Sequence, residues 1–199
     1  PPAIRRGLGE EFRPWLHLDL RHDTRSRAMR AGSPQDGFWG RLKLQASYQD
    51  DRLHPRAQLD LRGYRGVPGG VLAGRARAAV AGRHLPFYDK LYLGGMYSVR
   101  GFPTHSLSDA GGDTWLWAGS LEYRTEIIGD RRGTKLAGLF FCDAGGSGNR
   151  EADAYPGVAA AVGYGLRLRV WWLDWLGLDV AFPLTERPLD NRFQVTASI

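Results

Sequence analysis

The feature of this sequence that most constrains its fold is a series of long runs in which apolar and polar residues alternate. The clearest run covers residues 38–49, where Leu42 and Leu44 alternate with Arg41 and Lys43. Successive side chains of a β-strand point to opposite faces, so such a run predicts a strand with one apolar face and one polar face. Nine runs of this kind, without a convincing helical pattern, predict an all-β antiparallel fold with strands near residues 16–21, 38–49, 56–62, 72–80, 115–126, 136–142, 162–170, 176–182 and 192–199.

Strand length and aromatic placement favour a membrane barrel over a water-soluble sandwich with an apolar core. Several runs extend for about 10–14 residues, whereas strands most often have about 5–6. Tryptophans gather near the strand ends, as in the aromatic girdles of barrels at a bilayer interface: Trp15, Trp39, Trp115, Trp117, Trp171, Trp172 and Trp175. We therefore expect a transmembrane antiparallel β-barrel whose apolar faces contact lipid and whose Arg, Gln, Glu and Asp side chains face a wet lumen.

Hydropathy is compatible with this expectation. The chain has no continuous apolar run of about 18 residues, so no transmembrane helix is predicted. The mean hydropathy of -0.37 suits a barrel because half of each strand faces water. A strand can span the bilayer with only about 9–11 residues, of which every second one is apolar.

The alternation is interrupted in two places. Residues 1–12 are basic and then acidic, and we interpret them as a linker or irregular lead-in to a barrel that covers residues 13–199. Residues 91–113 are rich in glycine and aromatic residues and follow neither the strand period nor the helix period. We expect them to form a long loop whose role is to place its arginine, Arg100.

The sequence lacks the residue patterns that several classes of function require. The net charge is +6, but the arginines are spread through strands and not clustered, so nucleic acid is not an expected partner. The five histidines lack metal-ligand spacing, and neither a nucleophile motif nor a phosphate loop is present, so we expect no metal, no cofactor and no enzyme activity. Four strand arginines either line a polar passage or form a solvated lumen face: Arg56, Arg62, Arg75 and Arg77.

Two motifs, in this order along the chain, resemble a known family. Gly94-Gly95-x-x-x-Val99-Arg100-Gly101-Phe102 is similar to the loop-six signature of BamA/TamA-type outer-membrane assembly factors, the bacterial surface antigen barrels related to two-partner-secretion pores. Phe141-Cys142-Asp143-Ala144-Gly145 resembles the F-x-D-x-G strand motif of the same family. The spacing around residues 120–124 and the ending at 163–199 are similar too.

The resemblance implies that the loop folds into the lumen and is held there by Arg100. The planar guanidinium fork can meet a carboxylate through two hydrogen bonds, and Asp143, which we place at a strand end, has the lumen-facing parity. We expect Glu122 to support this pair, and the alternative is a solvated loop arginine. The expected loop-locking residues are Gly94, Gly95, Val99, Arg100, Gly101 and Phe102, and the expected lumen partners are Asp143, Glu122, Phe141 and Gly145.

The strand count limits what this chain represents. The family barrel has sixteen strands, and its loop six joins the eleventh strand to the twelfth. Five predicted strands follow the loop here, as in the family, but only about four precede it. The chain is then the C-terminal part of a sixteen-stranded barrel, a small barrel of about eight strands if one strand prediction is mistaken, or one of two chains that combine.

The resemblance also implies a function at the bacterial outer membrane. We expect insertion, assembly or translocation of proteins, with lipopolysaccharide and phospholipid, unfolded barrel or secreted client proteins, and further copies of the chain as partners. The last strand would form one side of a seam that templates client strands, through Phe193, Val195, Ala197 and Ile199. The alternatives are a two-partner-type secretion pore, and the membrane anchor of a larger secreted protein such as a hydrolase.

Overall fold

The computed structural model describes residues 14–49, 51–130, 133–149, 157–170, 173–185 and 193–198. The expected lead-in at residues 1–12 lies outside the described residues. The strands are β1 (Trp15–Asp23), β2 (Met29–Arg30), β3 (Ser33–Pro34), β4 (Gly37–Gln49), β5 (Arg52–Val67), β6 (Gly70–Ala81), β7 (Trp115–Asp130), β8 (Gly133–Gly148), β9 (Ala159–Val170), β10 (Leu173–Pro183) and β11 (Gln194–Ser198). A single 3-10 turn, η1 (Phe87–Asp89), is the only helical element in these ranges, and no described helix is long and apolar enough to cross a bilayer.

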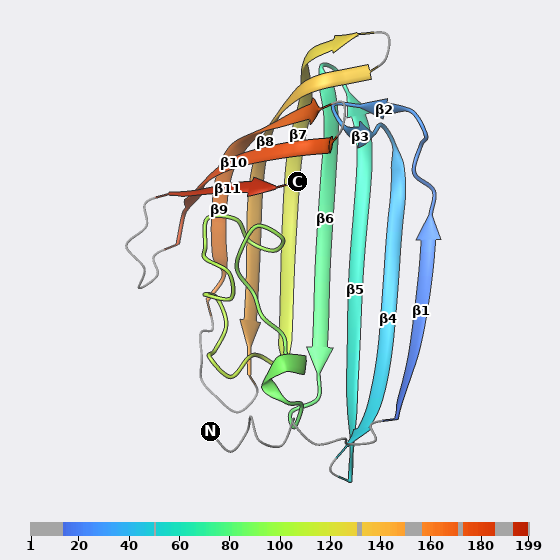
Figure 1. The fold of residues 1–199 in the computed structure, drawn as a ribbon, viewed down its shortest axis with the longest axis vertical. Helices are drawn as coiled ribbons and strands as arrows, with labels where there is room; N and C mark the ends of the chain where they lie inside the picture. The colour runs from blue at the N-terminus through green and yellow to red at the C-terminus, as the bar shows by residue number, and fades with distance from the viewer. Residues whose placement is uncertain are drawn as a thin grey trace.

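Nine of these strands form one curved sheet in chain order (Figure 1). Each strand pairs with the next one in antiparallel register, so that Leu44 of β4 faces Ala57 of β5 and Ser120 of β7 faces Asp143 of β8. The predictions of an all-β antiparallel fold and of nine strands are confirmed for the described chain, although β11 has only five residues. All nine predicted strands are present, so none of the nine strand predictions was mistaken.

The two faces of the sheet have opposite character. On β7 and β8, Leu121 and Phe140 point outward and are 59% and 64% exposed, whereas Glu122 and Asp143 point inward and are 9% and 1% exposed. A water-soluble sandwich would bury the leucines and phenylalanines against a second sheet, because each exposed apolar surface costs about 25 cal/mol per Å² in water. Their exposure along the outer face is the pattern of a lipid-facing barrel wall, so the sandwich alternative is wrong.

Strand β8 is longer than the sequence suggested. It runs to Gly148, where it still pairs with Trp115 of β7, so Asp143 lies inside the strand and not at its end. The glycine-rich end of β8 has the composition of a turn. A side chain at Gly145 would bring its Cβ within 2.8 Å of Val99 Cγ2, so this glycine makes room for another segment. Close packing, not a turn, explains glycine at this position.

The connection between β6 and β7, residues 82–114, doubles back along the strands (Figure 1). Leu91 and Asp113 pair with each other near its two ends, and Leu107 N–H donates to Leu93 O. The main apolar core lies between this connection and the inner face of the sheet, and it comprises Leu93, Val99, Phe102, Leu107, Ala118, Ala159 and Ala161. The fold therefore carries the Arg100 loop on its inner face.

Candidate functional site

Small residues on β8, β9 and β10 leave room for the loop backbone to pack closely against the wall. Ala161 and Ala181 are buried and point inward, and both lie next to Gly101 of the loop. A Cβ at Gly101 would be 3.2 Å from Ala161 Cβ and 3.5 Å from Ala181 Cβ. Larger side chains on either strand would hold the loop backbone away from the wall.

Two glycines of the loop motif are favoured both by their backbone conformation and by the limited space around them. Gly94 has a φ of +108°, and a Cβ at this position would lie 2.6 Å from Pro103 O. Gly101 has a φ of +91° directly after Arg100. Residues with a side chain rarely adopt such φ angles, so these two positions favour glycine. The resulting backbone turn directs the side chain of Arg100 toward the wall.

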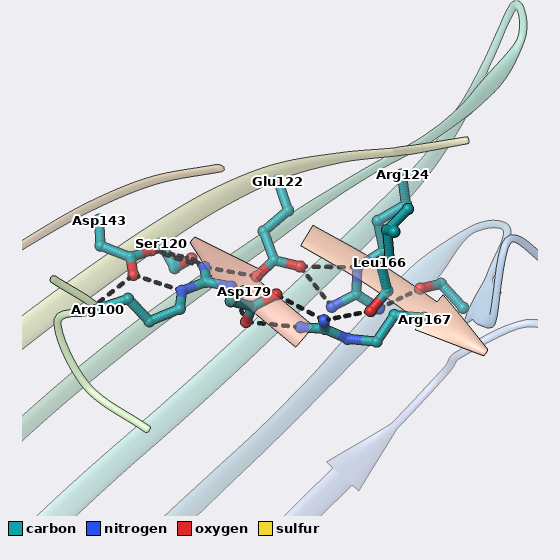
Figure 2. Close-up of polar contacts among 9 residues, drawn as sticks. Arg100, Ser120, Glu122, Arg124, Asp143, Leu166, Arg167 and Asp179 are labelled. Carbon is teal, nitrogen blue, oxygen red and sulfur yellow. Dashed lines mark hydrogen bonds and ion pairs between the residues drawn. The ribbon is translucent and has the colours of Figure 1, made fainter. Parts of the chain in front are cut away.

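Arg100 binds Asp143 through three hydrogen bonds (Figure 2). Its Nε donates to Oδ2 at 2.7 Å, its Nη2 donates to Oδ1 at 2.9 Å, and its backbone N–H donates to Oδ2 at 3.1 Å. Both residues are buried, with 6% and 1% of their surfaces exposed. The two parallel side-chain bonds are the bidentate geometry that fixes orientation as well as distance.

Three further polar groups surround the same guanidinium. Nη2 lies 2.6 Å from Glu122 Oε1 and donates to Ser120 Oγ at 3.1 Å, while Nη1 donates to Asp179 Oδ2 at 3.4 Å. The ring of Phe141 lies under the guanidinium carbon, 3.5 Å from its centroid, and adds a cation–π contact. One loop residue is thereby bound to strands β7, β8 and β10.

Two more arginines complete the cluster. Arg124 Nε donates to Glu122 Oε2 at 2.7 Å, and the two Nη groups of Arg167 donate to Asp179 at 2.6 and 2.8 Å. With Arg100, the three cations balance the three carboxylates, so no net charge is buried. Burial by itself lowers the pKa of Arg100, but the hydrogen bonds to Asp143 and the neighbouring carboxylates outweigh it and raise the pKa above its usual range.

Sequence reasoning missed four members of this cluster: Ser120, Arg124, Arg167 and Asp179. Asp179 is a buried acid of β10, and its register neighbour on β9 is Gly165, where a Cβ would lie 2.0 Å from Asp179 Oδ1. An acid with the inward parity among the leucine, valine and phenylalanine residues of this strand was the available signal. The contact of Asp179 with Arg100 depends on the curvature of the sheet, which cannot be predicted from the alternation of apolar and polar residues.

The predicted seam strand is placed only in part. Val195 lies in β11, points outward and is 52% exposed, and Ala197 has the same orientation. Phe193 precedes the strand, and Ile199 lies outside the described residues. β11 pairs with β10 on one side, and in the described sheet β1 and β11 are the two end strands.

A second connection reaches the inner face at the end of the sheet opposite to η1 (Figure 1). Strands β2 and β3 form a hairpin in which Ser33 is fully buried, and Ser33 Oγ accepts a hydrogen bond from Arg124. The ring of Trp175 on β10 packs against Gly32 at the tip of the hairpin. The hairpin is thus tied to the Arg100 cluster through Arg124 and Glu122.

We expect Arg124→Gln to loosen this hairpin. The change removes the hydrogen bond to Ser33 and the ion pair with Glu122, while Glu122 keeps Arg100. Losing about 1.4 kcal/mol of local stability would raise amide hydrogen exchange over residues 24–36 by about tenfold. Arg52→Gln, which removes an exposed arginine at the start of β5, should leave that exchange unchanged, and equal rates in both variants would contradict the coupling.

In the part of the chain that the structure describes, no group of three or more His, Cys, Asp or Glu is arranged to hold a metal ion. The cluster around Arg100 consists of charged groups that satisfy one another. Such an arrangement can hold a segment in place.

Comparison with known proteins agrees with this architecture. A model of the Omp85 superfamily domain matches residues 7–199, which is nearly the whole chain. The chain belongs to the Omp85 superfamily. No curated protein sequence matches this Omp85 chain significantly.

A solved structure shows the same fold. This Omp85 chain superposes on the crystal structure of BamA from Haemophilus ducreyi lacking POTRA domains 1–3, with a TM-score of 0.79 and 19% sequence identity. The match covers 92% of this chain and 42% of the BamA chain, so the chain spans less than half the length of that relative. The resemblance to BamA-type barrels that the sequence motifs suggested is confirmed.

Proposed function

We propose that this chain is part of a bacterial outer-membrane barrel that inserts or translocates other proteins without enzymatic catalysis. Membership of the Omp85 superfamily and the BamA-like fold support this at a general level. The observation that carries the proposal is the loop bound to the inner wall by Arg100, because a segment inside the barrel can shape the wall beside which clients pass.

The proposed role of the cluster is to brace one side of the barrel. Arg100 joins β7, β8 and β10, and β10 in turn carries the end strand β11. A rigid neighbour lets β11 keep its conformation while its other edge pairs with a client strand, as in binding by strand addition. The nine strands would then be the C-terminal part of the family's sixteen-stranded barrel, with residues 91–113 as its inward loop.

The test uses the full-length protein in liposomes made from outer-membrane phospholipid and lipopolysaccharide. An unfolded outer-membrane barrel protein is added, and its folding is followed by resistance to protease. We expect faster folding than in liposomes that hold an unrelated porin. If the client folds at the porin rate, while an unfolded secreted protein instead accumulates inside the liposomes, the barrel translocates proteins as in the secretion-pore alternative, and the insertion part of the proposal is wrong.

A further inference from the structure

The inner face of β4, β5 and β6 carries many more cations than carboxylates. Its inward-facing cations are Arg41, Lys43, Arg56, Arg62, Arg75 and Arg77. The one carboxylate on these three strands that faces inward in the described chain is Asp60, and Arg62 and Arg75 already bind it at 3.2 and 2.6 Å. This wall differs from the Arg100 cluster, whose charges balance.

A cavity of about 220 Å³ lies between this wall and the start of the 82–114 connection. Its lining includes Arg41, Lys43, Arg56 and Arg77 from the three strands, and the connection adds a fifth cation, Lys90. Arg41 is paired with Asp19 at 2.5 Å. The other four form no ion pair among the described residues, and Arg77 donates instead to the backbone oxygen of Tyr97 at 3.0 Å.

These four cations are half-buried, and the carboxylates near them, Asp60 in the cavity lining and Asp89 near Arg56, are fewer than the cations, so their grouping is unfavourable without a further counter-charge. Partial burial weakens the screening of like charges by water, and each cation loses part of its own hydration. An anion in the cavity would offset both effects. Donors would reach it from three strands and from the connection, so an anion that accepts hydrogen bonds from several directions suits the cavity best.

We infer that this cavity binds an oxyanion of the phosphate type, a free phosphate or the phosphate of a lipid headgroup. Guanidinium forks match phosphate oxygens in pairs, and lysines add point charges. A carboxylate is a poorer match, because two arginines suffice to saturate one here, as Arg62 and Arg75 do for Asp60. This inference does not rest on the proposed function, and either can fail while the other stands.

The test is calorimetric titration of the full-length protein in detergent with pyrophosphate, at an ionic strength held constant with chloride. We expect saturable binding that weakens about fivefold in Lys43→Gln and in Lys90→Gln, and about 25-fold in the double variant. The structure shows no side-chain hydrogen bond or ion pair of these lysines with the described residues, so replacing them should leave the fold intact. The matched control, Arg65→Gln, removes the exposed arginine of β5 and should leave binding unchanged.

Competition and control titrations decide the source of the phosphate and can overturn the inference. Pyrophosphate that is displaced by lipopolysaccharide in the micelle would identify a lipid headgroup as the ligand, and pyrophosphate that is not displaced would identify free phosphate. The inference is overturned if the wild-type protein shows no saturable binding, or if Arg65→Gln weakens binding as much as the lysine variants. It is also overturned if a hexa-aspartate peptide binds the same residues more tightly than pyrophosphate does.

Discussion

Replacing Arg100 by alanine is expected to release the 82–114 connection from the inner face of the sheet. Glu122 would keep Arg124 and Asp179 would keep Arg167, but Asp143 would retain only the hydroxyl of Ser120. A buried carboxylate that loses its cation costs about 3–5 kcal/mol. We expect the urea-unfolding free energy to fall by about this amount, and a protease added outside to cut the connection where the wild-type protein resists.

A double-mutant cycle separates the Arg100–Asp143 interaction from general damage. Asp143→Asn in an Arg100→Ala background should cost about 1–3 kcal/mol less than in the wild-type protein, because the orphaned carboxylate is gone. Arg65→Ala, at an exposed position where the pair with Asp36 spans 3.8 Å, should change neither stability nor proteolysis. Additive losses in the cycle would show that the loop is not held by this pair.

A methyl group at position 163 is expected to disturb the same site from beneath. Gly163 lies on β9 under Phe141, and a Cβ there would come within 2.3 Å of both Phe141 Cζ and Val180 O. The ring could move, but the backbone oxygen of a paired strand cannot move without breaking the sheet. Gly163→Ala should therefore cost about 1–3 kcal/mol through overpacking and shift Phe141 away from the Arg100 guanidinium.

The matched control for this change is Gly74→Ala. Gly74 is also a strand glycine, on β6, but a Cβ there would meet nothing within 4 Å. Urea unfolding should show a loss for Gly163→Ala and little change, or a small gain, for Gly74→Ala, because alanine is less costly than glycine to order in a strand. Faster protease cleavage of the connection should accompany only the first. Equal behaviour of the two variants would refute the close-packing account.

The alternation of apolar and polar residues predicted most of the fold. Each strand buries one face and exposes the other, so the identity of Leu121 and Glu122, as neighbours on β7, already assigned the outer and inner faces. The ends of strands were harder to predict from sequence, and the end of β8 shows the reason. Gly145 and its neighbours have the composition of a turn, but they are strand residues that leave room for Val99 of the loop.

The candidate site likewise contains residues that the sequence could identify and residues that it could not. Arg100, Asp143 and Glu122 could be named from motif and parity, because each property belongs to one strand or one loop. Arg167 and Asp179 could not be linked to them, since β10 approaches Arg100 only through the curvature accumulated across the sheet. The contact between Ser33 and Arg124 was hidden for a similar reason, because those residues lie 91 positions apart in the chain.

The sequence by itself determined that this protein is an antiparallel wall with one apolar and one polar face, interrupted by an arginine-bearing loop. Those properties follow from local alternation and composition, which each segment carries independently. Only the tertiary structure decided which charges meet, because the curved sheet brings β7, β8 and β10 around one guanidinium. Charge balance within that cluster, and its absence on the inner wall of β4–β6, are properties of the assembled sheet and not of any one strand.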